Sequence, residues 1–239
     1  MGRGHIDVRD ASPVMEPEKQ NVLRLNVLLL GRPQSGKSAT GNTILGSVEF
    51  PSRLSPGTVT QECRLRCRVF PGYLRRQGSE VALRLQVLDT PAYPNSLLSL
   101  ERAKEEIVGK VERALEPGPQ VVVLVLRADV PFCEEDCRLI QLAEDLLGPA
   151  WRSHTLLVLS HSDSIDKAGI SGEEYLTQAS GAFQALLESL EHRYHFVDNS
   201  AAWLQPEGRP LVDKLLAIAR QNKYKPLQFR QDNLDVKIS

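Results

Sequence analysis

An eight-residue segment, Gly31 to Ser38, constrains this chain more than any other feature. It reads Gly-Arg-Pro-Gln-Ser-Gly-Lys-Ser and matches the pattern G-x-x-x-x-G-K-[ST]. In this pattern the glycines let the backbone pass close to a phosphate and turn its N–H groups inward. The lysine places an ammonium near the outer phosphates, and the last hydroxyl ligates Mg²⁺. The segment therefore predicts a site for a nucleoside triphosphate with Mg²⁺.

The residues on either side of the segment fit this interpretation. An apolar run over 23–30 predicts a strand buried on both faces, and a helix is expected over 37–45. The helix N-terminus would add partial positive charge beside the phosphates. The alternative, a glycine-rich turn that only happens to contain Lys-Ser, does not require this context. We assign the loop and the residue after it to phosphate binding: Gly31, Arg32, Pro33, Gln34, Ser35, Gly36, Lys37, Ser38 and Ala39.

The rest of the chain alternates strands with helices. We expect strands over 63–70, 81–88, 121–126, 155–160 and 195–197, with a turn over 71–78, and helices over 98–115, 134–147, 172–190 and 209–221. Such alternation implies βαβ units and a mostly parallel sheet covered by helices. The predicted fold class is therefore α/β, a P-loop NTPase.

A second motif, VLDTP, places Asp89 at the C-terminal end of a predicted buried strand. Ligands of α/β sheets bind at that edge, and an acid there can hold the Mg²⁺ shell through water. The alternative is an aspartate that begins a turn before Pro91. Many GTPases carry a glycine whose N–H contacts the γ-phosphate where this chain has Ala92, and the Ala92 N–H can still donate there, although its backbone is less free to rotate. The next position, where many GTPases carry a water-orienting glutamine, is Tyr93. We therefore expect slow hydrolysis.

Composition excludes several other classes. The net charge is -1, with 41% hydrophobic and 25% charged residues, so nothing points to a nucleic-acid or anionic-membrane partner. The longest apolar runs, 25–30 and 121–126, are far shorter than the roughly 20 residues that span a bilayer. The N-terminus lacks the apolar stretch of a secretory signal, and Ile6 breaks the myristoylation motif.

The four cysteines form two pairs, Cys63 with Cys67 and Cys133 with Cys137, each with three residues between them. Structural zinc ligands usually come in tighter pairs, and a secreted disulfide framework is not expected in a long chain without a signal. We interpret the cysteines as free thiols in a reducing compartment, which predicts a cytoplasmic location.

Three stretches resemble the GTPases of immunity-associated proteins, the AIG-type GTPases related to septins and chloroplast import GTPases. These are residues 23–50, residues 87–94 (VLDTPAYP) and residues 132–151, which resemble the signature box of that family. The resemblance covers about residues 22–222 and implies a six-stranded domain that binds GTP or GDP with Mg²⁺. Residues 1–21 are polar, contain two prolines and show no periodicity, so we expect a flexible tail there. Residues 223–239 form a C-terminal tail with no amphipathic or apolar anchor, and by the resemblance they lack the membrane-binding extension of larger relatives.

The resemblance also assigns further site residues. Thr60 matches a mobile-loop threonine that senses the γ-phosphate and joins Ser38 and Asp89 at the metal. Asp163 would accept both guanine N–H groups, which rejects adenine. His161 packs near the base or is an ordinary polar turn residue. Asn199 matches the last base-contacting asparagine, with a turn residue as the alternative.

One departure bears on catalysis and partners. The resemblance implies a homodimer across the nucleotide face. It also implies an arginine, at the start of the signature box, that acts on the nucleotide across this dimer. At that position this chain has Val130-Pro131-Phe132-Cys133. A proline cannot replace that charge. Arg127 lies near, but at a strand end. Three functions stay open: a slow GTPase switch that changes loops 50–61 and 90–100, a non-hydrolysing nucleotide-binding scaffold for assembly, and, because the base motif is degraded, an ATP-binding protein.

Overall fold

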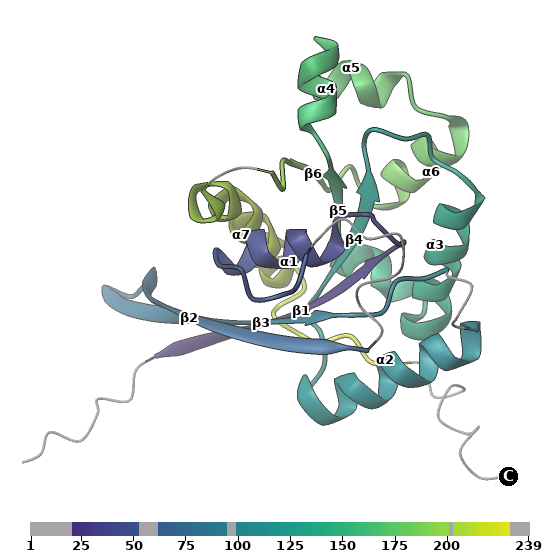
Figure 1. Cartoon of the computed structure of the whole chain (residues 1–239). Coiled ribbons are helices and arrows are strands. Elements are labelled where there is room, and N and C mark those ends of the chain that lie inside the picture. Colours follow the sequence, from purple (N-terminus) through teal and green to yellow (C-terminus); the bar gives the residue numbers. More distant parts are fainter. Residues whose placement is uncertain (1–20, 53–61, 95–98, 201–202, 230–239) are drawn as a thin grey trace, which may run out of the picture.

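A six-stranded sheet forms the centre of the computed structural model, which describes residues 21–52, 62–94, 99–200 and 203–229 (Figure 1). The strand order is β2-β3-β1-β4-β5-β6, and only β2 runs antiparallel to its neighbour. The strands are β1 (Val22–Gly31), β2 (Arg64–Arg76), β3 (Ser79–Asp89), β4 (Val121–Arg127), β5 (Thr155–Ser160) and β6 (Tyr194–Val197). Five parallel strands thus end at the same edge of the sheet.

Helices cover both faces of this sheet. The helices α1 (Lys37–Leu45) and α7 (Leu204–Gln221) lie on one face, and α2 (Leu100–Ala114), α3 (Glu134–Leu147) and α6 (Gly181–Ser189) lie on the other. Shorter helices follow: η1 (Pro149–His154) before β5, and α4 (Asp163–Ala168) and α5 (Gly172–Thr177) after it. The predicted α/β class, with three layers around a mostly parallel six-stranded sheet, is confirmed.

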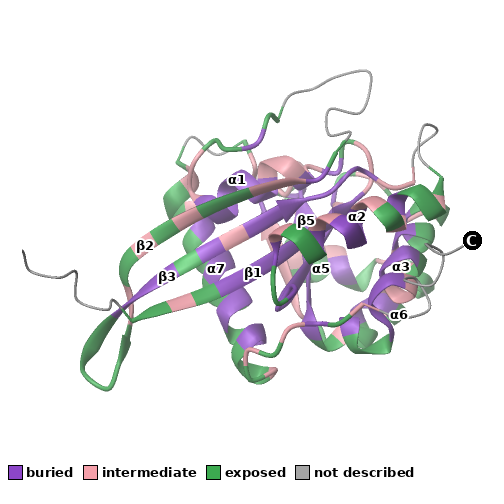
Figure 2. Cartoon of the chain, turned by 90° about the horizontal axis from the view of Figure 1, so that it is seen from below, coloured by how far each residue is buried: buried purple, intermediate pink, exposed green. Residues whose placement is uncertain are grey.

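The core explains why β1 is a nearly continuous apolar run. Leu25, Val27 and Leu29 pack in the cluster beneath α1 and α7, whereas Leu28 and Leu30 pack in the cluster beneath α2 and α3. All five side chains are buried, because both faces of this strand are covered. Figure 2 shows the same burial along β1 and β3, and an exposed far end of the β2–β3 hairpin.

The turn predicted over 71–78 is wrong in extent. The strand β2 runs to Arg76, and the turn consists of Gln77 and Gly78, both with positive φ (50° and 81°). Pro71-Gly72, which resembled the turn signal, lies instead where the register shifts between Phe70 and Leu74. Pro71 has no backbone N–H to donate to the ladder, and Gly72 has a positive φ. Together they form a bulge in the strand without reversing the chain.

Three helix predictions need correction. The single helix expected over 172–190 is two, because Ser180 caps a new helix through a hydrogen bond from the N–H of Phe183. The short helix α4 was not predicted. The last helix begins at Leu204 rather than at residue 209, and Pro210 lies inside it. The helix expected over 98–115 begins at Leu100, and residues 95–98 lie outside the described residues.

The described chain continues to pack beyond α7. Leu227 is buried in the cluster beneath α2 and α3, and its N–H donates to the carbonyl of Pro119 at 2.8 Å. The residues of the predicted tails that lie at 1–20 and 230–239 are outside the described residues.

Candidate functional site

The segment Gly31–Ser38 connects β1 to α1 at the edge where the parallel strands end. Two of its glycines are required by geometry. A Cβ on Gly31 would lie 2.5 Å from the Oγ atom of Ser35 and 3.1 Å from the carbonyl oxygen of Val125. Gly36 has a φ of 78° and immediately precedes α1. The loop is therefore tightly folded, with the start of α1 directed toward the site.

Three of the predicted site residues meet at this loop. The Lys37 ammonium lies 2.5 Å from Oδ1 of Asp89, and the Ser38 hydroxyl donates to Oδ2 of the same carboxylate at 2.6 Å. Lys37 also donates to the carbonyl of Thr90. Lys37 and Asp89 are 4% and 1% exposed, so the cation and the acid form a buried pair, and the half-buried Ser38 hydroxyl lies at its edge. A buried charged pair of this kind is held by its own hydrogen bonds.

The helix α3 anchors the loop from one side. The guanidinium Nε of Arg32 lies 2.6 Å from Oδ1 of Asp136, a carboxylate that is only 2% exposed. The other oxygen of Asp136 accepts the N–H of Cys133 at 3.0 Å, which caps α3. Arg32 also donates to the Cys133 sulfur at 3.2 Å. Sequence reasoning missed Asp136, although its position three residues after the cap was a readable capping signal.

The strands β5 and β6 anchor the loop from the other side. The Ser160 hydroxyl donates to the carbonyl of Ser35 at 2.7 Å. The Asn199 amide nitrogen donates to the hydroxyl of Thr40 at 3.1 Å, and its oxygen accepts the hydroxyl of Thr43 at 3.1 Å. It also approaches the Gly36 carbonyl at 3.4 Å. Asn199 thus supports α1 in this structure, a contact that its predicted role at a base did not include.

The predicted base-recognition residues follow β5. His161 has a φ of 60°, and its Nδ1 lies 2.9 Å from the hydroxyl of Ser160. Asp163 begins α4, and its carboxylate accepts a hydrogen bond from Lys167 at 2.7 Å. That hydrogen bond lowers the pKa of Asp163 below its ordinary value. Both residues follow the carboxyl end of β5, the edge at which the phosphate loop lies.

The segment after β3 also reaches the loop. The N–H of Tyr93 donates to the carbonyl of Gly31 at 3.2 Å, and the Tyr93 ring packs against the core beneath α2 and α3. Ala92 is buried beside it. The remaining predicted site residue, Thr60, lies outside the described residues.

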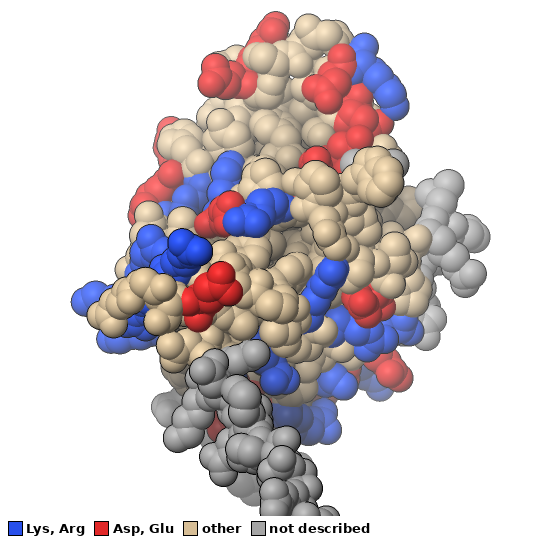
Figure 3. Space-filling view, turned by 90° about the vertical axis from the view of Figure 1, so that its left-hand side faces the viewer, with Lys and Arg blue, Asp and Glu red and all other residues tan. Residues whose placement is uncertain are grey.

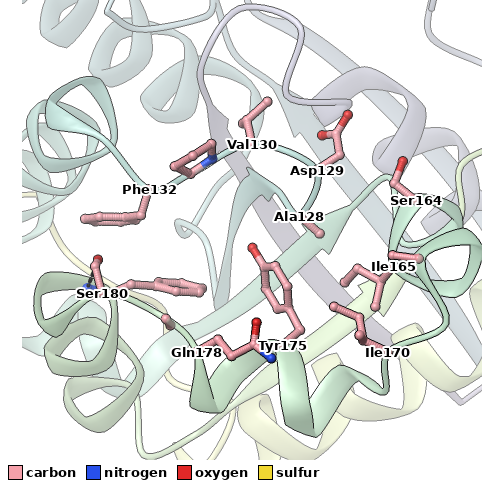
Figure 4. Close-up of a pocket in the computed structure, with 14 residues that line it drawn as sticks. Ala128, Asp129, Val130, Phe132, Ser164, Ile165, Ile170, Tyr175, Gln178 and Ser180 are labelled. Atoms are coloured by element: carbon pink, nitrogen blue, oxygen red, sulfur yellow. Dashed lines mark hydrogen bonds between the residues drawn. The ribbon is translucent and has the colours of Figure 1, made fainter.

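The loop after β4, where the family arginine is replaced, is largely apolar. It contributes residues 128–132 to a pocket of about 600 Å³ that α4, α5 and α6 complete (Figure 4). The Phe132 ring stacks on Phe183, with centroids 5.4 Å apart. Arg127 is held by its neighbour Asp129 through two hydrogen bonds, of 2.9 and 2.6 Å, and these lower the pKa of the carboxyl.

The cysteines are free thiols in different settings. Cys63 is buried, and burial raises its pKa to about 12. Cys67 and Cys137 are exposed, and Cys133 is half-buried at the start of α3. Only one of the four is therefore the small buried hydrophobe that free cysteines commonly are.

Comparison with known proteins supports the sequence resemblance. Residues 25–234 match the AIG1 family. Immune-associated nucleotide-binding protein 7 of Arabidopsis thaliana is 28% identical over 196 residues, which are 81% of this chain and 59% of that protein. GTPase IMAP family member 8 of Mus musculus is 31% identical over 150 residues, which are 63% of this chain and 20% of that protein. This chain thus spans less than two thirds of either relative.

A solved structure has the same fold. Toc33 from Arabidopsis thaliana in complex with GDP and Mg²⁺ superposes with a TM-score of 0.61 at 23% identity, covering 87% of this chain and 88% of that one. Among the described residues, no helix has the length and apolar character needed to cross a membrane.

Proposed function

This chain belongs to the AIG1 family, and from that premise we propose that it is a GTP-binding protein with slow or absent hydrolysis that acts as a nucleotide-dependent switch. One observation carries the proposal: the buried pair of Lys37 and Asp89 meets the half-buried Ser38 hydroxyl at the phosphate loop. The relatives named as nucleotide-binding proteins and GTPases, and the GDP complex of Toc33, support the choice of nucleotide.

The residues present fit a magnesium nucleotide. The Ser38 hydroxyl and the Asp89 carboxylate supply the oxygen ligands that Mg²⁺ prefers, and Lys37 supplies a cation for the outer phosphates. The Ser35 hydroxyl is buried and has no hydrogen-bond partner among the described residues, so the loop retains an unused donor. Mg²⁺, when bound, would neutralise charge on the phosphate oxygens. We propose Thr60 as a third oxygen donor.

For base recognition we propose Asp163 and His161, with Asn199 supporting the loop. The lowered pKa of Asp163 keeps it ionised, which a guanine-binding carboxylate requires. Lys167 donates to only one of its two oxygens, so the carboxylate can accept further hydrogen bonds. A preference for ATP would contradict this assignment.

Slow hydrolysis is supported by three local arrangements. The Tyr93 ring packs against the core, and phenol is a poor substitute for a carboxamide that orients water. Phe132 turns into the apolar pocket, and no cationic side chain lies in the 130–132 segment. Arg127 is tied to Asp129, so it must break two hydrogen bonds before it can reach another site. These arrangements also favour the second candidate, a scaffold that holds GTP without useful turnover.

We further propose a homodimer across the nucleotide face and a cytoplasmic location. Dimerization is important for the GTPase activity of Toc33, a protein of the same fold. The four free cysteines agree with a reducing compartment.

The test of the nucleotide proposal is a thermal shift with Mg²⁺-GTP on the purified full chain. GTP should raise the melting temperature, ATP should raise it less, and Lys37→Ala should abolish the shift, because stabilisation follows occupancy. Lys225→Ala, an exposed lysine beyond α7, is the matched control. An unchanged GTP shift in Lys37→Ala would overturn the proposal.

Single-turnover hydrolysis at several protein concentrations tests the slow rate. We expect a flat rate near the intrinsic scale of roughly 10⁻⁴ to 10⁻³ per second. A rate that climbs with concentration and disappears in Arg127→Ala, but not in the exposed control Arg138→Ala, would instead identify a dimer-activated enzyme.

A further inference from the structure

The strand β2 is an open edge of the sheet. It pairs with β3 on one side only, and no described strand pairs with its other side. From Arg64 to Phe70 the pairing with β3 keeps a continuous register, and the shift comes only after Phe70. This seven-residue stretch therefore presents a regular row of backbone N–H and C=O groups, which is a template for another strand.

The same strand carries an unusual concentration of positive charge. Its arginines, with no acid among them, are Arg64, Arg66, Arg68, Arg75 and Arg76. None of the five forms an ion pair with a described carboxylate, whereas arginines elsewhere, such as Arg32 and Arg152, do. In Figure 3 blue atoms gather over the part of the face that carries the β2–β3 hairpin, and a group of red atoms lies at the top, where α4 and α5 lie.

Two of these arginines are positioned by neutral contacts that leave their charge uncompensated. Arg68 donates to the carbonyl of Leu45 at the end of α1, at 2.7 Å. Arg66 donates to the carbonyls of Glu49 and Leu65, at 3.2 and 3.0 Å, and its guanidinium lies 6.0 Å from the centroid of the Phe50 ring. These contacts hold the two guanidinium groups beside the strand. A carboxylate could therefore form charge-assisted hydrogen bonds with them without first reorienting the side chains.

We propose that β2 is a docking edge for an acidic, extended peptide segment of a partner protein, which adds a seventh strand to the sheet. The main chain of the partner would satisfy the open edge, and its acidic side chains would meet the arginines. A second copy of this chain is a poor occupant, because pairing two such edges would place the three arginines of each 64–70 stretch, six in all, beside one another. This proposal is independent of nucleotide binding.

The probe is a heptapeptide of alternating Glu and Val, labelled with fluorescein, and the assay is fluorescence anisotropy with the full chain. The matched control peptide has the same sequence with alternate residues N-methylated, which keeps the charge and removes the hydrogen bonds of one edge. We expect the control to bind about tenfold more weakly or worse, because about three inter-chain hydrogen bonds are lost. Equal binding of the two peptides would overturn strand addition.

A charge reversal tests the arginines. Arg66→Glu should weaken peptide binding by about threefold to tenfold, because the reversal removes an exposed ion pair and also adds a like-charge repulsion of similar size. Arg220→Glu makes the same change at the end of α7, next to a segment that contacts Ser153 rather than β2, and should leave the affinity unchanged. Equal losses in both variants would mean that only net charge matters, and this would overturn the proposal.

Amide hydrogen exchange locates the contact without any substitution. The peptide should slow exchange at alternate amides of residues 64–70. Protection at another part of the chain would overturn the proposal in favour of another surface. The proposal would also fail if vesicles of phosphatidylserine or a single-stranded oligonucleotide protected this edge and the peptide did not, because the partner would then belong to another class.

Discussion

The ion pair between Arg32 and Asp136 gives the sharpest prediction about the phosphate loop. It joins residues 104 positions apart, and the Asp136 carboxylate is 2% exposed while the Arg32 side chain is 18% exposed. Asp136→Asn removes the charge but keeps an oxygen that can cap the N–H of Cys133. The substitution therefore isolates the ion pair from the helix cap.

The expected magnitude follows from the geometry. Breaking a fully buried pair by removing one partner costs about 3–5 kcal/mol. Here the two nearest atoms are 2.6 Å apart but are not aligned as a hydrogen bond, and the guanidinium remains near solvent. Asp136→Asn should therefore lower the free energy of unfolding by about 2 kcal/mol, and Asp136→Ala by about 1 kcal/mol more, because the cap is also lost.

Urea unfolding followed by tryptophan fluorescence measures this loss, because Trp151 is fully buried. The midpoint should fall while the slope with urea stays the same. Glu135→Gln is the control, since Glu135 lies beside Asp136 on the exposed side of α3. If Asp136→Asn shifts the midpoint no more than this control does, the ion pair does not hold the loop and the reasoning is refuted.

Three further predictions follow from single contacts. Asn199→Ala should lower the free energy of unfolding by about 1–3 kcal/mol in urea melts, because the Thr40 and Thr43 hydroxyls lose their shared partner; no change would refute the bracing role. Gly208→Ala should cost about 1–3 kcal/mol, because its Cβ would lie 2.0 Å from the Thr43 carbonyl oxygen, whereas Gly181→Ala, with nothing within 4 Å, should not. Burial lowers the pKa of His195 from 6.5 to about 4, so the unfolded chain binds this proton more readily, and stability present above pH 6.5 should fall as the pH drops toward 4, by about 2–3 kcal/mol. His195→Gln should flatten this dependence in urea melts at several pH values, and an identical dependence in both proteins would contradict the assignment.

The elements that were predicted well carry their signals locally. The strand β1 and the helix α1 follow from an apolar run, two glycines and Lys-Ser within 23 residues. The helix α3 ends at Gly148-Pro149, as its sequence indicates. By contrast, α4 has only six residues, which is too short for a helical period to be recognised, and Ser180 divides α5 from α6 by a cap that apolar spacing alone conceals.

The site residues also differ in whether a local sequence pattern identifies them. The residues of the phosphate loop and Asp89 could be named because their motifs are contiguous, and the structure brings Lys37, Ser38 and Asp89 together. The side chains that brace the loop could not, since Ser160 and Ser35 are 125 positions apart and no local pattern links them. Their partnership depends on the strand order, which places β5 two strands from β1.

Asn199 shows why the position of a residue at a strand end can be predicted more readily than the groups to which its side chain forms hydrogen bonds. The sequence places an amide after β6, at the sheet edge where nucleotides bind in α/β folds. Both a base and α1 lie within the reach of such a residue, and an amide can donate to one group while it accepts from another. In this structure its nitrogen and oxygen engage Thr40 and Thr43. The second amide hydrogen points to the Gly36 carbonyl at 3.4 Å, so only the amide oxygen keeps an unused lone pair. A further hydrogen bond to that lone pair is therefore compatible with the contacts to α1. The hydroxyl partners on α1 tie the orientation of the amide to the position of the phosphate loop.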